Sequence, residues 1–160
     1  FTAVMYKVLF VCLGNICRSP LAEGIFKHLL KEHKLDDRIS CDSAGTANYH
    51  VGENPDPRTI DIAMKYGIHI HHKGRQFSAK DFDVYDLVVA MDASNKTNIL
   101  KLARTEEDKN KVLLMRDFDA KRSGLNVPDP WYGDMKGFDD SYHLLIECCT
   151  NLLPHAVSSY

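Results

Sequence analysis

The sequence predicts a single α/β domain with a central four-stranded parallel sheet, helices on both faces and a flavodoxin-like strand order. Short apolar, β-branched runs alternate with segments of helical periodicity, and this order produces parallel strands joined by right-handed crossovers. The 160 residues fit one domain of ordinary size, and 44% of them are hydrophobic, which is enough for a core without disulfide crosslinks. We therefore expect residues 1–160 to form one domain.

The first half of the chain contains two predicted strands, each followed by a helix. Residues 4–11 are almost continuously apolar, as expected of a strand that is covered on both faces. Pro20 suits the first position of a helix whose apolar residues repeat every four positions. The second strand is predicted at 39–45, ISCDSAG. The next helix is expected to open at Asp56-Pro57 and to stop at Gly67.

The second half repeats the pattern. DLVVAMD, residues 86–92, predicts a third buried strand, which is followed by a short helix over 95–102. KVLLM, residues 111–115, predicts the fourth strand, and a polar loop at 129–134 leads to the last helix. One stripe of that helix carries Tyr142, Leu145, Cys149 and Leu152. Ligands of parallel α/β sheets bind beyond the carboxyl ends of the strands, so polar residues near these ends are expected to converge.

Composition argues against several classes of partner. Twenty basic and 22 acidic residues give a net charge of −2 without a basic stripe, so we expect no nucleic-acid partner. No segment approaches the roughly 18 apolar residues that span a bilayer, and FTAVMYKVLF lacks the basic leader and cleavage site of a signal peptide. Five cysteines without framework spacing favour a reducing compartment. We expect a cytoplasmic protein with no membrane partner.

The segment VLFVCLGNICRSP, residues 8–20, carries the chemistry. Between a strand and a helix, backbone N–H groups point at one spot and the helix dipole adds positive potential. Gly14 and Asn15 can adopt the positive φ angles of a tight anion cradle, and Arg18 can grip an oxyanion with two prongs. The same surroundings favour the thiolate form of Cys12, while Ser19 can donate to it or brace the loop. The predicted cradle comprises Leu13, Gly14, Asn15, Ile16, Cys17 and Ser19, with Cys12 as nucleophile.

VCLGNICRSP resembles the signature of the low-molecular-weight protein tyrosine phosphatases, a family of acid phosphatases. SAGT at 43–46, MD at 91–92 and DPWYG at 129–133 also recur in the family's order, so the resemblance covers essentially the whole chain. It implies a metal-independent phosphatase that needs no cofactor. The implied substrates are phosphotyrosine proteins and small aryl phosphates, hydrolysed through a phosphocysteine intermediate. The site would also hold phosphate, sulfate or vanadate.

The resemblance implies a role for each catalytic residue. Cys12 would attack phosphorus in line while Arg18 and the loop amides hold the equatorial oxygens. Asp129 would protonate the leaving phenolate and then act as base for the water that cleaves the phosphocysteine. Asp92 is the rival carboxylate, and the resemblance gives it a structural part near the loop.

The resemblance also assigns supporting residues. Ser43 and His72, together with Asn15, would hold the loop in its strained shape. Three aromatic residues in polar loops are expected to line a deep slot for a phosphoaryl group: Tyr49, Trp131 and Tyr132. Such depth favours phosphotyrosine over phosphoserine. The HIHH run at 69–72 lacks further ligands at metal-binding spacing, so no metal site is expected there.

Three positions bear on specificity and regulation. Bacterial relatives that act on phosphoarginine carry Thr where this chain has Ile16, so Ile16 favours phosphotyrosine. Trp131 replaces the first tyrosine of the Tyr-Tyr pair of many animal members, so regulation by phosphorylation there would rest on Tyr132. The family also suggests a reversible disulfide between Cys12 and Cys17 that protects the nucleophile from overoxidation.

Rival functions lack residues that they need. A thiol-dependent arsenate reductase relays through further cysteines after residue 80, but none lies between Cys41 and Cys148. A cysteine phosphocarrier would need neither Arg18 nor an acid in DPWYG. A non-catalytic phosphotyrosine-binding module would not need both Cys12 and Asp129. We expect a monomeric phosphatase, and the physiological substrate stays open.

Overall fold

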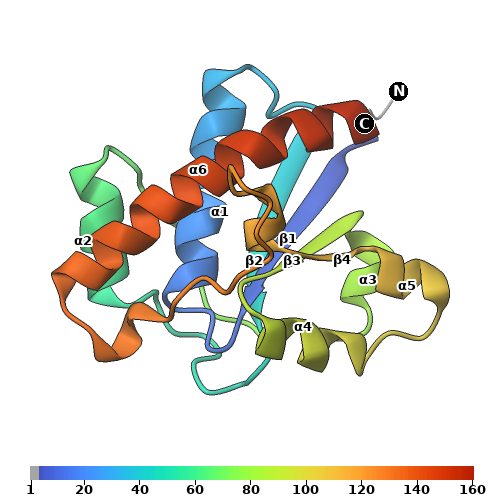
Figure 1. Ribbon diagram of the computed structural model, residues 1–160, viewed down its shortest axis with the longest axis horizontal. Helices are drawn as coiled ribbons and strands as arrows, with labels where there is room; N and C mark the ends of the chain where they lie inside the picture. The colour runs from blue at the N-terminus through green and yellow to red at the C-terminus, as the bar shows by residue number, and fades with distance from the viewer. Residues whose placement is uncertain (1–3) are drawn as a thin grey trace.

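A computed structural model of the protein describes residues 4–160, and its centre is a parallel sheet (Figure 1). The strands lie in the order β2-β1-β3-β4, and every neighbouring pair is parallel. Their bounds are Tyr6–Cys12 for β1, Ile39–Gly45 for β2, Leu87–Ala90 for β3 and Val112–Leu114 for β4. The predicted sheet and its flavodoxin-like order are confirmed. The order reverses between β1 and β3, where such sheets bind ligands.

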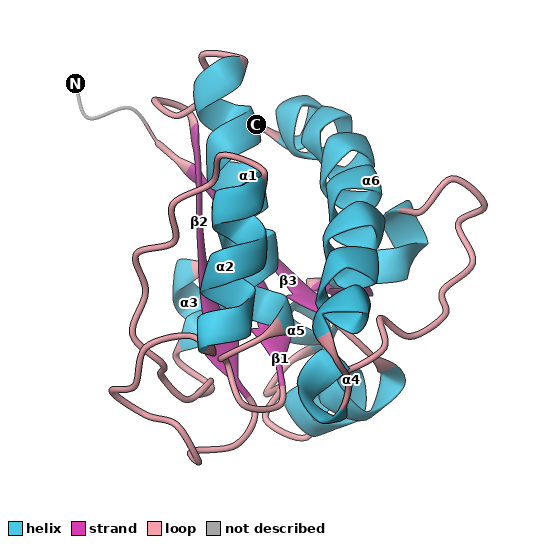
Figure 2. Cartoon of the chain, turned by 90° about the vertical axis from the view of Figure 1, so that its left-hand side faces the viewer, coloured by secondary structure: helices cyan, strands magenta, loops and turns pink. Residues whose placement is uncertain are grey.

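Helices cover both faces of the sheet, as Figure 2 shows with the sheet seen nearly edge-on. One face is covered by α1 and α6, with α2 packed against both. The other face is covered by α3 and α4, and α5 contacts β4. The bounds are Arg18–Glu32 (α1), Pro57–Lys65 (α2), Asp81–Val84 (α3), Ala93–Leu100 (α4), Glu106–Asn110 (α5) and Met135–Ser159 (α6). Short 3₁₀ turns lie at Met115–Phe118 and Pro130–Tyr132.

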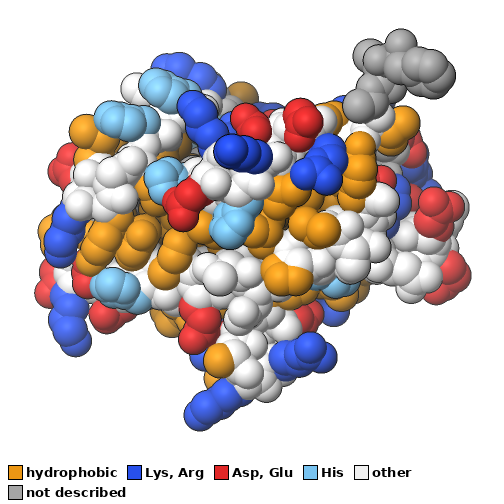
Figure 3. Space-filling view, turned by 90° about the horizontal axis from the view of Figure 1, so that it is seen from above, with side chains coloured by type: hydrophobic (Ala, Val, Ile, Leu, Met, Phe, Trp, Pro, Cys, Tyr) orange, Lys and Arg blue, Asp and Glu red, His pale blue; other side chains and the backbone are white. Residues whose placement is uncertain are grey.

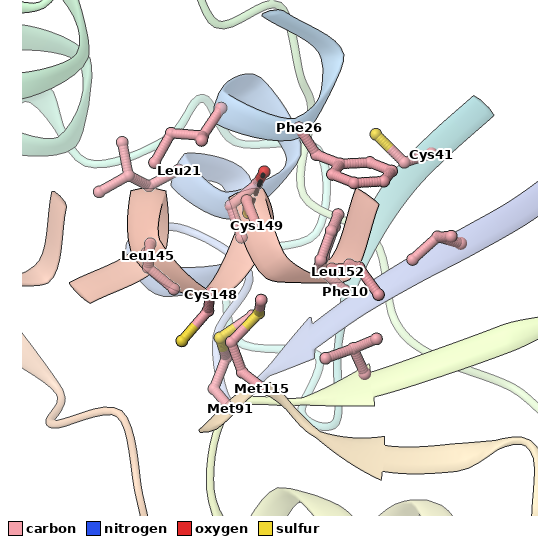
Figure 4. Close-up of a cluster of buried hydrophobic side chains, with 14 of the residues drawn as sticks. Phe10, Leu21, Phe26, Cys41, Met91, Met115, Leu145, Cys148, Cys149 and Leu152 are labelled. Atoms are coloured by element: carbon pink, nitrogen blue, oxygen red, sulfur yellow. Dashed lines mark hydrogen bonds between the residues drawn. The ribbon is translucent and has the colours of Figure 1, made fainter. Parts of the chain in front are cut away.

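The core explains why the β1 segment is continuously apolar. Side chains alternate along a strand, so Val8 and Phe10 face α1 and α6 whereas Leu9 and Val11 face α3 and α4. All four are completely buried. Figure 4 shows the larger cluster, in which Phe10 meets helix residues such as Phe26 and Leu152. This double burial holds β1 in the interior of the sheet, and Cys12 is its last residue.

Several boundaries differ from the sequence prediction. Helix α1 begins at Arg18, two residues before Pro20, because the turn after Cys17 already has helical geometry. Helix α4 begins at Ala93, since Asp92 caps it by accepting a hydrogen bond from Asn95 N at 2.7 Å. The prediction missed α3 and α5, which are too short to show helical periodicity. The amino-terminal segment expected not to be a signal peptide lies partly outside the described residues.

The surface carries mixed charges. Seen from above, basic, acidic and histidine side chains are interspersed with apolar ones on the face formed by α1 and α6 (Figure 3). Within residues 4–160, no helix combines the length and hydropathy required to cross a membrane.

Candidate active site

A pocket of about 200 Å³ opens beyond the carboxyl end of β1, at the switch point of the sheet. Two segments form most of its walls: the phosphate loop, residues 12–19, and the acid loop, residues 129–133. The lining residues are Cys12, Leu13, Gly14, Ile16, Cys17, Arg18, Tyr49, His50, Asp129, Trp131 and Tyr132. The pocket therefore gathers segments that lie more than one hundred residues apart in the sequence.

Cys12 is the last residue of β1, and its side chain is 3% exposed. Its Sγ lies 3.0 Å from Ser19 Oγ, and the Asn15 backbone N–H points at Sγ from 3.3 Å. Both groups can donate a hydrogen bond to a thiolate. Because α1 begins at Arg18, the helix amino terminus adds positive potential at the same place.

Arg18 lies on the first turn of α1, and its side chain is 3% exposed. Its Nη1 donates to Asp92 Oδ2 at 2.7 Å and to Val127 O at 3.0 Å. Its Nη2 lies 3.6 Å from Asp129 Oδ2. Nε is buried, and among the described residues it has no acceptor. A buried, unpaired donor is costly unless a ligand satisfies it, so Nε marks an oxyanion position.

Asn15 holds the phosphate loop in shape. Its φ is +57°, a left-handed conformation that Asn tolerates better than most residues. Its Nδ2 donates to Ser19 Oγ at 2.8 Å and to Ser43 Oγ at 3.0 Å. Its Oδ1 accepts from Arg75 N at 3.0 Å and contacts His72 Nε2 at 2.7 Å. Asn15 is 1% exposed, so these bonds replace water and fix the strained turn.

A buried charge cluster lies behind Asn15. His72 Nδ1 lies 3.0 Å from Glu23 Oε1 and 3.4 Å from Asp42 Oδ1. Burial by itself would lower the pKa of His72, but the hydrogen bonds and charges of Asp42 and Glu23 outweigh it and raise that pKa to about 9. Ser43 Oγ donates to Glu23 Oε1 at 2.6 Å. The cationic ring thus compensates the buried Glu23 and fixes the donor direction toward Asn15.

Glu23, Asp42 and His72 are residue types that can hold a cation, and their ligand atoms lie within 4.8 Å of one another. A protonated imidazole has no lone pair for a metal, and the raised pKa of His72 keeps it protonated at neutral pH. Glu23 Oε2 is also taken by Lys27 Nζ at 2.6 Å. A proton therefore occupies the position that a metal would need.

The acid loop presents Asp129 to the pocket. Asp129 Oδ1 accepts from Trp131 N at 3.1 Å, which ties the carboxylate to the turn that follows it. Oδ2 is left facing Arg18, and the side chain is 36% exposed. Asp92 differs, because both its oxygens are committed to Arg18 and to the cap of α4. Of the two carboxylates, only Asp129 lines the pocket.

Aromatic side chains surround the mouth. Tyr49 and Tyr132 are 70% and 92% exposed, and Trp131 is 39% exposed. His50, which the sequence analysis missed, also lines the mouth, and its ring lies 6.0 Å from the Trp131 ring. Its place directly after Tyr49 in the sequence could have indicated that it also lies at the mouth. The rim therefore offers flat surfaces on which an aryl group can stack.

The structure brings together most of the predicted residues and corrects one. Asn15, Ser19, Ser43, His72 and Asp92 do not line the pocket but lie directly behind it. The prediction that Gly14 adopts a positive φ is wrong, because Asn15 alone does so in this loop. A Cβ at Gly14 would lie 3.1 Å from His50 Cδ2, so the His50 ring would have to shift by a few tenths of an ångström. Glu23 and Arg58 were missed, since the sequence around a charged helix residue does not show which distant groups it will contact.

The fold and the site are those of an α/β protein with a buried cysteine in a strand-to-helix loop at the switch point of its sheet. A sequence model of the family described as low molecular weight phosphotyrosine protein phosphatase matches residues 7–159. The chain belongs to this family.

Relatives and solved structures agree. The chain is 46% identical to the low molecular weight phosphotyrosine protein phosphatase of Saccharomyces cerevisiae over 139 residues, which are 85% of this chain and 86% of that one. A protein tyrosine phosphatase of Entamoeba histolytica, solved with Hepes in the active site, superposes with a TM-score of 0.91 at 37% identity, covering 96% of this chain and 98% of that one. A Drosophila arginine phosphatase superposes with a TM-score of 0.86 at 36% identity, covering 93% and 96%.

Proposed function

We propose that this protein is a cysteine-dependent phosphatase that hydrolyses phosphotyrosine in proteins, and small aryl phosphates, through a phosphocysteine intermediate. The observation that carries the proposal is the buried, unpaired Arg18 Nε beside a buried Cys12 in one loop. The same arrangement would bind phosphate, sulfate or vanadate. It needs no metal or cofactor, since Arg18 and the loop amides supply the positive potential.

In the first step Cys12 Sγ attacks phosphorus, forming an S–P bond as the P–O bond to the phenol breaks. Arg18 Nε and Nη2 and the loop amides stabilise the equatorial oxygens. Asp129 gives its proton to the departing phenolate.

In the second step Asp129, now a carboxylate, takes a proton from water. The water oxygen bonds to phosphorus and the S–P bond breaks, which releases inorganic phosphate and the Cys12 thiolate. Ser19 Oγ at 3.0 Å and Asn15 N–H at 3.3 Å are placed to stabilise that thiolate. Asn15, Ser43, His72 and Asp92 keep the loop and Arg18 in position.

The pocket favours a flat, long substrate. Cys12 is buried and the aromatic rim is exposed, so a phosphoryl group must reach inward while its carrier stacks outside. Ile16 gives the pocket an apolar wall where a phosphoarginine guanidinium would need acceptors. Since one structural neighbour is an arginine phosphatase, phosphoarginine is the competing substrate to test.

Three finer expectations belong to this proposal. Cys12 and Cys17 are both free and both line the pocket, so peroxide can oxidise the two thiols to a disulfide that a thiol reductant reverses. Further, we propose a monomer in the cytoplasm, where a reducing poise keeps Cys12 active. A Cys17→Ser variant that still shows lasting thiol-reversible protection would contradict the disulfide.

The test is hydrolysis of p-nitrophenyl phosphate with a chelator present, from mildly acidic to neutral pH, followed by phosphotyrosine and phosphoarginine peptides. We expect turnover by the native protein, none by Cys12→Ser and higher kcat/KM for phosphotyrosine. A native protein that binds vanadate but does not turn over would be a receptor or carrier instead. Higher kcat/KM for phosphoarginine would overturn the substrate assignment.

A further inference from the structure

Arg58 contacts the back of the acid loop although it lies outside the pocket. It is the second residue of α2, and its Nη2 donates to Trp131 O at 3.1 Å while Nη1 donates to Gly133 O at 3.2 Å. Its guanidinium carbon lies 5.6 Å from the centroid of the Trp131 ring and 4.6 Å from that of Phe138. One planar cation is thus hydrogen-bonded to the acid loop and packed against it.

The same guanidinium is anchored on its other edge. Its Nε and Nη2 donate to the Asp56 carboxylate at 3.1 and 3.0 Å. Asp56 is 7% exposed and also caps α2 by accepting from Arg58 N at 2.8 Å. The backbone N–H of Asp56 donates to Ile16 O at 2.8 Å, and Ile16 belongs to the phosphate loop. A chain of hydrogen bonds therefore runs from the phosphate loop through Asp56 and Arg58 to the acid loop.

Asp129 is held in the same turn that Arg58 grips. Its Oδ1 accepts from Trp131 N, and Gly133 N closes the turn on Pro130 O at 2.9 Å. At its start, this segment is fixed by Val127, which donates to Met91 O at 2.8 Å and accepts from Arg18. At its end, Arg58 supplies two donors to its carbonyls. Without them the exposed turn could shift relative to Cys12.

We propose that Arg58 is a positioning residue that sets where Asp129 delivers its proton, by clamping the acid loop to Asp56 and so to the phosphate loop. This inference rests on the proposed phosphatase activity with Asp129 as general acid. Arg58 does not line the pocket, so it acts through the loop. Loss of Arg58 should therefore slow the reaction most for substrates whose leaving group needs a proton.

Leaving groups separate this role from general damage. A p-nitrophenolate leaves with little help, whereas phenolate needs a proton from the general acid. Misplacement of a catalytic group by about 1 Å can cost about 10²-fold. We expect Arg58→Ala to reduce kcat/KM, which reports phosphoryl transfer to Cys12, about 10- to 100-fold on phenyl phosphate and far less on p-nitrophenyl phosphate. Arg58→Lys keeps the charge but cannot reach both carbonyls and Asp56, so it should show the same pattern more weakly.

The experiment measures kcat/KM for a series of aryl phosphates with native protein, Arg58→Ala, Arg58→Lys and Asp129→Ala, with inhibition by phosphate and thermal melting alongside. Arg104→Ala is the matched control, since Arg104 makes comparable ion pairs with Asp83 and Asp108 away from the pocket. If Arg58→Ala does not fold, Arg58→Lys carries the test.

Support is a steeper dependence of kcat/KM on leaving-group pKa in the Arg58 variants, intermediate between native and Asp129→Ala, with phosphate inhibition retained. An equal loss on every substrate, or no loss, overturns the positioning role while the phosphatase activity stands. A native protein without turnover would instead overturn the proposed function, and with it this inference.

Discussion

The two loops that face each other across the pocket are built in opposite ways. The phosphate loop is mostly buried apart from Leu13: Asn15 is 1% exposed, and its side chain bonds to Ser19, Ser43 and the backbone of Arg75. The acid loop is exposed, with Tyr132 92% accessible, and it is held by Arg18 near its start and by Arg58 at its end. Cys12 thus lies in a loop held by buried hydrogen bonds, whereas Asp129 lies on an exposed turn that is hydrogen-bonded near its start and at its end.

This difference suggests a division of labour. A nucleophile and anion cradle must be preorganised before the substrate binds, because its charge stabilisation depends on fixed dipoles in a dry site. The acid must meet leaving groups of different sizes, so an accessible turn with firm ends suits it. Substitutions in the phosphate loop should therefore change folding and binding together, whereas those in the acid loop should change the chemical step or substrate contact with little effect on folding.

The largest effect is expected from Asp129→Ala. Loss of the general acid should lower kcat about 10²- to 10⁴-fold, with little change in melting temperature, because the side chain is partly exposed. Asp92→Ala should instead lower the melting temperature, since it removes the α4 cap and the partner of Arg18. Aryl phosphate kinetics and melting curves check both. A steep leaving-group dependence in Asp92→Ala but not in Asp129→Ala would reverse the assignment of the acid.

Gly45→Ala should damage the phosphate loop from outside it. A Cβ at Gly45 would lie 2.7 Å from Leu13 O and 3.2 Å from the Asn15 Cβ, so the loop backbone must move. We expect a loss of about 1–3 kcal/mol in the free energy of unfolding, together with weaker phosphate inhibition. Urea unfolding measures the loss of stability, and the inhibition constant for phosphate measures the damage to the loop.

The matched control is Gly137→Ala on the first turns of α6, where the nearest neighbour of a Cβ would be Pro130 Cβ at 3.8 Å. Alanine at this helix position should leave the free energy of unfolding unchanged or raise it slightly. Equal behaviour of the two alanine variants would show that the end of β2 does not constrain the phosphate loop.

The charge cluster behind Asn15 should make stability depend on alkaline pH. Because folding raises the pKa of His72 from 6.5 to about 9, its contribution is complete below about pH 6.5 and is lost as pH rises through 9. At about 1.4 kcal/mol per pKa unit the contribution amounts to a few kcal/mol at most. The free energy of unfolding is measured in urea for native protein and His72→Gln at pH 6, 7.5 and 9.5. The advantage of the native protein should shrink as the pH rises. A constant difference would mean that the ring is neutral.

The smallest effect is expected from Tyr132→Ala. The side chain is almost fully exposed, so stability should change by no more than about 0.5 kcal/mol. We expect kcat/KM for p-nitrophenyl phosphate to stay within about twofold, since the surface residue touches no reacting atom. A phosphotyrosine peptide should be affected more, because its flanking residues lie over the rim. A large loss on the small substrate would show that the rim shapes the phosphate site itself.

The sequence alone determined the order of the four strands and the longer helices along the chain, and the identity of the phosphate loop. Both are local: the strand is a continuous apolar run, and the helix begins within a few residues of Cys12. Cys12 and Arg18 are six positions apart, so one turn of chain brings them to the same anion. The family motifs placed Asp129 near them by analogy.

Only the tertiary structure decided how the acid loop and the loop supports are held. Glu23, buried on α1, and Arg58, on α2, pair with residues 20 to 75 positions away, and no periodicity reveals such partners. The sheet order brings the ends of β1, β2 and β3 together, and that order sets which distant side chains meet. A local pattern fixes backbone conformation over a few residues, whereas the partner of a buried charge depends on which segments the completed sheet makes neighbours.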